Sequence, residues 1–132
     1  MPEFRDTCRV RCFDTKVVER LRRILPADDD LEEARIRFSA LADPARIKLL
    51  VALRGGEELC VCDVAQLLGI QFAAASHHLR KLRDLRILRL RNNGKMAYYS
   101  LRDPLVGELA ALALGVRRGK QRAAKPSQRR DS

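Results

Sequence analysis

Four cysteines in two close pairs are the residues of this sequence best suited to do chemistry. Cys60 and Cys62 are two residues apart, Cys8 and Cys12 are four apart, and the 132 residues contain no other cysteine. Sulfur ligands in a four-coordinate set suit zinc, cadmium and lead far better than magnesium or calcium. A free cysteine can instead be a small buried hydrophobe, and a pair can act as a redox switch. Two close pairs favour a thiolate metal site over buried hydrophobes.

The spacing of each pair restricts the backbone that brings its two thiols together. Residues two apart on a regular helix point about 200° away from each other, so Cys60 and Cys62 cannot share an ion from inside a helix. They can share one if Cys60 lies in extended backbone and Cys62 in the first turn that follows. Cys8 and Cys12 meet on one face if their segment coils. Three arginines near this second pair favour the ionised thiols: Arg5, Arg9 and Arg11.

Cys60 and Cys62 stand at the start of two predicted helices, separated by a break at Gly69. In residues 57–85 the apolar side chains recur at helical spacing on both sides of that glycine. The second helix has an apolar face of Phe72, Ala75, Leu79 and Leu82. Its opposite face carries small, hydrogen-bonding and cationic side chains, as a helix in the DNA major groove requires. The alternative is an ordinary helical hairpin with a solvated charged face.

Positive charge is concentrated in the second half of the sequence. The formal charge is +10, but residues 1–75 carry −1, whereas residues 76–102 carry +7 and residues 117–132 carry +6. A basic block over the second helix and the segment after it indicates a nucleic-acid-binding face. No apolar run approaches 18 residues, and the N-terminus has no signal-peptide pattern. We therefore expect a cytoplasmic protein with reduced thiols and no membrane span.

The rest of the sequence predicts further helices and one β-hairpin. Asp43 is expected to cap a helix that begins at Pro44, and Gly55-Gly56 to end it. Asn93-Gly94 is the strongest short hairpin signal in the chain. The helices are expected over residues 15–24, 31–42, 44–54 and 105–116, and the strands over residues 86–91 and 95–101.

This order of elements predicts a mainly α (α+β) fold, a winged helix-turn-helix with a β-hairpin wing. We expect residues 1–14 to be a mobile N-terminal arm with metal ligands, residues 15–116 to be the DNA-binding and dimerisation domain, and residues 117–132 to be a basic disordered tail. The helices over residues 15–24 and 105–116 are unusually apolar for terminal helices. They either form a homodimer seam or close the core.

The expected DNA face consists of the second helix of the central pair and the wing. The adjacent side chains of His77 and His78 diverge by about 100° and cannot bind one metal ion together. His77 faces outward and is expected to contact DNA, whereas His78 lies on the flank of the helix and is more typical of a hydrogen-bonded structural histidine. No catalytic triad and no glycine-rich phosphate loop is recognisable, so an enzyme is not expected. The candidate DNA-contacting residues are Gln71, Ser76, His77, Arg80, Lys81, Arg91 and Lys95, the last two on phosphates.

Four segments of the sequence form a recognisable set: residues 40–46 (ALADPAR), 58–63 (ELCVCD), 75–79 (ASHHL) and 94–101 (GKMAYYSL). Together they resemble the ArsR/SmtB family of metal-sensing winged-helix repressors, over about residues 31–116. The Cys-Val-Cys motif, with a second pair at Cys8 and Cys12, is similar to the cadmium- and lead-responsive CadC branch in particular.

The resemblance implies a homodimer that binds a partly palindromic operator in the absence of metal. It also implies that Cys8 and Cys12 of one subunit join Cys60 and Cys62 of the other in a four-thiolate site. Cd(II) or Pb(II), with Zn(II) as a further candidate, would then release the repressor from double-stranded operator DNA. The runner-up is a repressor of the same fold that is switched by thiol oxidation. A structural-zinc interaction module without a DNA role is the third alternative.

Two features depart from the family pattern. Gln71 stands where relatives often open the recognition helix with Ser or Thr, and it is a poorer N-cap. The family's other metal site lies between the C-terminal helices and uses Asp, His and Glu ligands. Here Asp103 remains, but Leu105 and Val116 stand where histidines are needed. We therefore expect one sensing ion per subunit and no second site.

Overall fold

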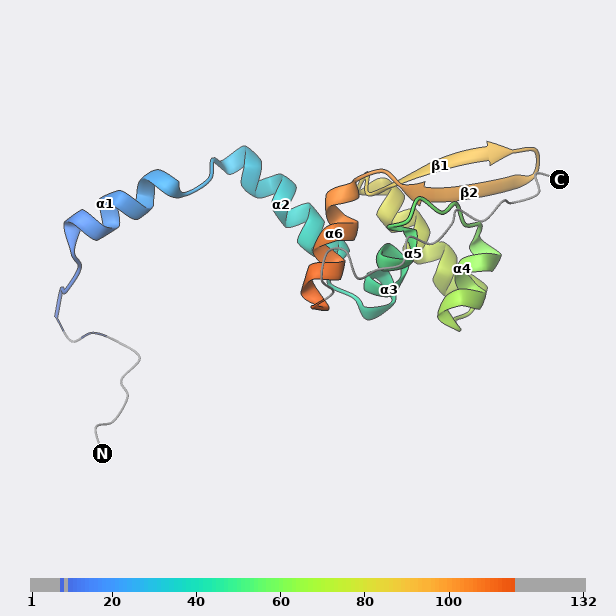
Figure 1. The fold of residues 1–132 in the computed structure, drawn as a ribbon, viewed down its shortest axis with the longest axis horizontal. Helices are drawn as coiled ribbons and strands as arrows, with labels where there is room; N and C mark the ends of the chain where they lie inside the picture. The colour runs from blue at the N-terminus through green and yellow to red at the C-terminus, as the bar shows by residue number, and fades with distance from the viewer. Residues whose placement is uncertain (1–7, 9, 116–132) are drawn as a thin grey trace, which may run out of the picture. The chain divides into compact units, whose positions relative to one another are not determined.

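The computed structural model describes residues 8 and 10–115, which contain six helices and one two-stranded antiparallel sheet (Figure 1). By contacts, the chain divides into two compact units, Met1–Glu32 and Glu33–Ser132. No helix in the described residues is both long and apolar enough to cross a membrane. In chain order the elements are α1 (Thr15–Ile24), α2 (Asp28–Ala40), α3 (Pro44–Leu53), α4 (Val61–Leu68), α5 (Phe72–Asp84), β1 (Leu88–Asn93), β2 (Met96–Leu101) and α6 (Pro104–Ala113).

The predicted order of helices and strands is confirmed, with shifts at several ends. α2 begins at Asp28, three residues earlier than expected, because its aspartates occupy the first turn instead of preceding it. Carboxylates in a first turn favour the helix through its dipole. α6 ends at Ala113, and the expected last residue, Val116, lies outside the described residues. The same is true of residues 1–7, 9 and 117–132, so the predicted arm and tail are described only in part.

In the first unit, the N-terminus of α1 is capped, and the apolar stripe of this helix is exposed. The Asp14 carboxylate accepts hydrogen bonds from the backbone N–H groups of Lys16 and Val17, at 3.0 and 3.3 Å. This is the expected role of an aspartate N-cap. None of the ten residues of α1 is buried, and its large apolar side chains are all exposed: Val17, Val18, Leu21 and Ile24.

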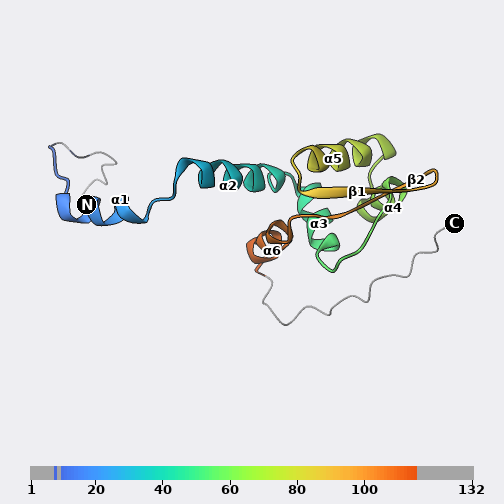
Figure 2. The same cartoon turned by 90° about the horizontal axis from the view of Figure 1, so that it is seen from above.

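In the second unit, the core lies between α3, α5, α6 and the hairpin. α4 packs against α5, α3 against α6, and α5 against β1, and Figure 2 shows α5 running alongside β1. Gly107 lets α6 lie close to the side chains of Leu101 and Arg54. A Cβ at this position would lie 3.0 Å from Leu101 Cδ2 and 3.3 Å from Arg54 Cγ. The largest fully buried side chains are Leu49, Leu50, Leu53, Val64, Leu79, Leu82, Ile87, Leu88 and Val106.

The break between α4 and α5 forms as the sequence predicts. Gly69 adopts a left-handed conformation with φ of 64°, and the Ile70 N–H donates to the Ala65 carbonyl at 3.1 Å. Glycine adopts this conformation without a steric cost. On α5, Ala75, Leu79 and Leu82 are buried as expected, but Phe72 is 59% exposed. The apolar face of α5 therefore begins one turn later than the spacing suggested.

The wing is a regular hairpin in which β1 and β2 pair from Leu88 with Leu101 to Asn93 with Met96. Gly94, with φ of 60°, and Lys95 form its two-residue turn. The alternation of β1 is as predicted, because Leu88 is buried while Arg89 and Arg91 are exposed. The hairpin signal at Asn93-Gly94 thus located the turn correctly, although Asn93 is still part of the strand.

Asp43 caps the start of α3, as expected. Its carboxylate accepts hydrogen bonds from the N–H groups of Ala45 and Arg46, at 2.9 and 3.2 Å. Desolvation opposes ionisation of this carboxyl. The N–H of Arg46, the charge of nearby His78 and the N–H of Ala45 outweigh it, and the pKa of Asp43 lies below its ordinary value of 3.8.

Asp43→Ala should lower the free energy of unfolding by about 1 kcal/mol at neutral pH, because the helix loses its N-cap. The folded-state pKa is depressed, so this contribution is present above the unfolded-state pKa and is lost as the pH falls through the folded-state value. Urea unfolding of both proteins between pH 7 and pH 3 measures the difference. A difference that grows toward acid pH would contradict this role.

Candidate nucleic-acid interface and metal centre

α5 presents its polar face to solvent, as a DNA-reading helix must. Gln71 is its N-cap residue, with extended backbone and no side-chain capping hydrogen bond, as expected for glutamine at that position. Ser76 is partly buried, and the Arg80 Nε donates to its carbonyl at 3.4 Å. The candidate contacts exposed on this face are Gln71, His77, Arg80 and Lys81. The N-cap residue and the four proposed contact residues within α5 thus all reach solvent.

The surface beside these residues is hollowed. An open hollow of about 480 Å³ is lined by His77, Arg80, Lys81, Asp84 and Leu85. The lining of this hollow has two cations and an imidazole but one carboxylate, so it favours anionic ligands. His78 is partly buried, as expected on the flank, but its buried Nδ1 atom has no hydrogen-bond partner among the described residues, so the expected hydrogen bond is not made by this atom. His77 and His78 therefore differ in environment, as the helical spacing predicted.

The wing carries the two cations expected on phosphates, but they differ in their contacts. Lys95 is exposed in the turn of the hairpin. The Arg91 Nε lies 2.8 Å from Glu58 Oε2, and its guanidinium lies over the Tyr98 ring, 5.0 Å from the centroid. Glu58 was not among the sequence-predicted functional residues. It is 33 positions away from Arg91, and no local pattern indicates a pairing over such a separation.

Cys60 and Cys62 lie in the backbone arrangement that was expected to let them share an ion. Cys60 is the N-cap of α4 in extended backbone, with φ of −87° and ψ of 172°, and Cys62 is in the first turn. The Cys60 thiol is 7% exposed, whereas Cys62 is exposed. The Cys60 N–H donates to Asp63 Oδ2 at 2.9 Å. An acid three residues after an N-cap is a capping signal, so the sequence could have shown this role of Asp63.

The segment that carries Cys60 is held against the wing. Leu59 forms an isolated antiparallel bridge with Tyr99 of β2. The Leu59 N–H donates to the Tyr99 carbonyl at 2.9 Å, and the Tyr99 N–H donates to the Leu59 carbonyl at 2.8 Å. Figure 1 shows the green segment before α4 running beside β2. The bridge explains why the backbone is extended up to Cys60 and turns helical only after it.

The two thiols of the first unit contact each other. A hydrogen bond with Cys8, together with some desolvation, raises the pKa of Cys12 above its ordinary value of 9.0. The arginine-rich sequence was expected to favour ionised thiols here, and for Cys12 the contact with Cys8 has the opposite effect. A proton must therefore leave Cys12 before its sulfur can bind a metal ion as thiolate.

Within residues 8 and 10–115, no three side chains of His, Cys, Asp or Glu gather closely enough to hold a metal ion. Each cysteine pair supplies two sulfur atoms. Four sulfur atoms are the donor set that zinc, cadmium and lead prefer, and two such pairs would supply that number. The sulfur donors of the four cysteines therefore fit a soft metal ion.

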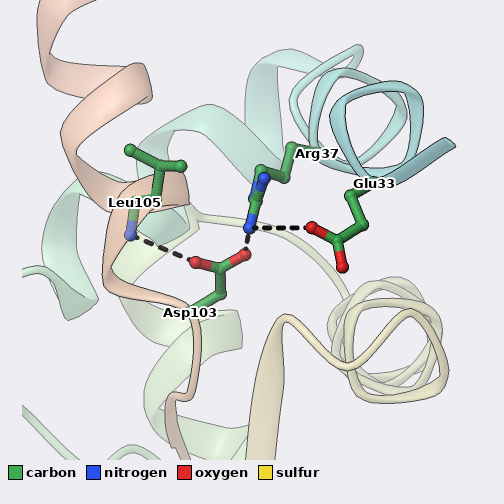
Figure 3. Close-up of polar contacts among 4 residues, drawn as sticks. All are labelled: Glu33, Arg37, Asp103 and Leu105. Carbon is green, nitrogen blue, oxygen red and sulfur yellow. Dashed lines mark hydrogen bonds and ion pairs between the residues drawn. The ribbon is translucent and has the colours of Figure 1, made fainter. Parts of the chain in front are cut away.

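The carboxylates of α6 are already paired with arginines. Asp103 Oδ2 lies 2.9 Å from the Arg37 Nε, and its other oxygen accepts the Leu105 N–H at 3.2 Å (Figure 3). The hydrogen bond with Asp103 is the largest of the effects that raise the pKa of Arg37. The Glu108 carboxylate accepts two hydrogen bonds from Arg54, at 2.9 and 3.1 Å. Both carboxylates thus have a cation beside them.

The helix-turn-helix, its hairpin wing and the basic face of α5 define a winged-helix DNA-binding protein. A family model described as bacterial regulatory protein, arsR family, matches residues 43–89. The cadmium resistance transcriptional regulatory protein CadC homolog of Staphylococcus aureus is 39% identical over 109 residues, which are 83% of this chain and 89% of that protein. The chain belongs to the ArsR family.

Other similarities agree with this assignment. The transcriptional repressor SmtB homolog of Synechocystis is 43% identical over 89 residues, covering 65% of this chain and 67% of that protein. The crystal structure of the AntR antimony-specific transcriptional repressor matches with a TM-score of 0.63 and 35% identity, over 70% of this chain and 83% of that one. The protein is thus a DNA-binding transcriptional regulator and not an enzyme. The likeness to CadC proteins supports the CadC-type branch.

Substitutions of Lys95 and His77 should separate phosphate contact from base reading. Lys95→Ala should weaken binding to all duplexes similarly and reduce the slope of log affinity against log salt by about 1, because one phosphate contact is lost. His77→Ala should instead change the relative affinities of related duplexes. Fluorescence anisotropy with a selected and a random duplex at several salt concentrations measures both. Unchanged affinities in both variants would show that the DNA face lies elsewhere.

Proposed function

We propose that this protein represses transcription by binding operator DNA as a metal-free homodimer, and that Cd(II) or Pb(II), with Zn(II) as a further candidate, releases it. The proposed ligands are Cys8, Cys12, Cys60 and Cys62. The observation that carries the proposal is the extended N-cap conformation of Cys60, which allows Cys60 and Cys62 to face one ion. The protein would act in the cytoplasm, where its thiols stay reduced.

Cys60 and Cys62 sit where metal binding can alter the DNA face. Cys60 opens α4, and α4 packs against the recognition helix α5. The metal ion would supply a cross-link between the two cysteine pairs and hold the start of α4 in one position. Binding free energies are reciprocal, so DNA must weaken metal binding by the same factor by which metal weakens DNA binding.

The homodimer is supported by apolar side chains that each unit leaves exposed. In the second unit, an apolar hollow of about 440 Å³ lies between α2, α3 and α6, and Leu112 at its edge is 65% exposed. In the first unit, the stripe of α1 is exposed along its whole length. Exposed apolar surfaces of this kind mark interaction sites. We propose that a second copy of the chain covers these surfaces, because a partly palindromic operator is bound by a dimer with two-fold symmetry.

We propose one sensing ion per subunit. Asp103 is the N-cap residue of α6 and Glu108 lies within the helix, and each carboxylate already has an arginine within hydrogen-bond distance. A metal ion there would have to displace a guanidinium from its carboxylate without help from imidazole or sulfur ligands. Zinc binds tightly when nitrogen or sulfur joins the donor set, so this region is a poor site for it.

The decisive experiment titrates the reduced protein, bound to a duplex selected from a random library, with cadmium. Sulfur-to-metal charge-transfer absorption and DNA release should rise together. Release by peroxide in the absence of metal, and not by cadmium, would instead support the redox alternative. A structural-zinc module would show no salt-dependent binding to duplex DNA.

Cys62→Ser should leave metal-free operator affinity unchanged and abolish release by cadmium, because the exposed Cys62 thiol carries the signal without touching DNA. Cys60→Ser should behave in the same way if its buried side chain tolerates oxygen. Anisotropy with and without cadmium measures both effects. Loss of operator binding in the metal-free Cys62→Ser variant would mark this cysteine as structural instead.

Equilibrium dialysis of the reduced protein against cadmium should give one tightly bound ion per subunit. A variant with all four cysteines replaced by serine should bind none tightly, because the α6 carboxylates are neutralised by Arg37 and Arg54. A tight ion that persists in the cysteine-free variant would disprove the assignment of the thiols as the only site.

A further inference from the structure

We infer that Glu58 competes with a DNA phosphate for Arg91, and that this competition links the cysteine-bearing segment to DNA binding by the wing. The inference rests on the proposed function, in which Cys60 and Cys62 bind the effector. It assigns a role to Glu58, a residue that neither reads DNA nor binds metal.

Arg91 is in contact with the segment that precedes Cys60. Its Nε lies 2.8 Å from Glu58 Oε2, and the Glu58 side chain is only two residues from Cys60. The guanidinium also lies over the ring of Tyr98, its cross-strand neighbour. The guanidinium of Arg91, on the wing, is thus paired with a carboxylate of the proposed sensing segment.

The pair is able to exchange partners. The side chains of Arg91 and Glu58 are 44% and 37% exposed, and exposed ion pairs contribute little to stability. A phosphate offers the same charge and geometry to a guanidinium as a carboxylate does. When the wing lies on DNA, a phosphate of the DNA backbone can therefore replace Glu58 as the partner of Arg91.

The position of Glu58 depends on the segment between the wing and α4. Leu59 is fixed to Tyr99 by two hydrogen bonds, and Cys60 is fixed to α4 through its N–H and Asp63. Restraint of Cys60 and Cys62 would restrain this short segment and favour the arrangement in which Glu58 keeps Arg91. DNA favours the opposite arrangement, so the two ligands oppose each other through one ion pair.

The test is a double-mutant cycle of Glu58→Gln and Arg91→Gln, read first without metal. Glu58→Gln should raise the affinity for selected and random duplexes by roughly two- to fivefold, as expected for loss of an exposed competing pair. In the Arg91→Gln background the same substitution should have no effect. An equal rise in both backgrounds would be a general charge effect and would overturn the inference.

The second measurement is the factor by which cadmium weakens operator binding. This factor should be smaller in Glu58→Gln than in the wild type, with one ion per subunit and an unchanged charge-transfer band. The matched control is Asp84→Asn, which removes a carboxylate beside the DNA face and should leave the factor unchanged. An unchanged factor in Glu58→Gln overturns the link to the thiols. If cadmium does not release the wild type, the proposed function fails, while the metal-free cycle still decides the competition for Arg91.

Discussion

The two hydrogen bonds between Leu59 and Tyr99 are the constraint on which the functional half of the molecule depends. They hold the chain extended up to Cys60, so that α4 can begin only at Val61. That start places Cys60 and Cys62 on different sides of a helix boundary. Without the bridge, α4 could extend backward by a turn, and the two thiols would then diverge as residues two apart on a helix do. One short backbone bridge to the wing therefore sets the backbone geometry at the two thiols.

Much of this arrangement could be predicted because its signals are local. Gly69 ends α4, Asp43 caps α3, and the alternation of Leu88 with Arg89 defines the wing. The extended backbone at Cys60 was predicted as a condition for metal binding, and the N-cap assignment meets that condition. The binding of metal by the four cysteines stays a prediction, as do the DNA contacts.

The contacts that the sequence did not reveal join residues far apart in the chain. Glu58 with Arg91, Arg37 with Asp103, and Arg54 with Glu108 are ion pairs whose partners no spacing rule connects. An arginine-rich sequence offers many partners for each carboxylate, and only the packing of the elements selects one. The exposure of Phe72 was missed for a similar reason, since periodicity gives the face of a helix but not how far the core extends along it.

The apolar stripe of α1 has a consequence for how this protein responds to its own abundance. A helix of ten residues without a buried side chain is marginal in water, so its persistence depends on what covers it. If the cover is a second subunit, helix content at α1 rises with protein concentration by mass action. Dilution would then unwind this helix, and the cysteine pair just ahead of it would lose its anchor. Sensing would in that case be a property of the assembled protein, absent from surplus single chains.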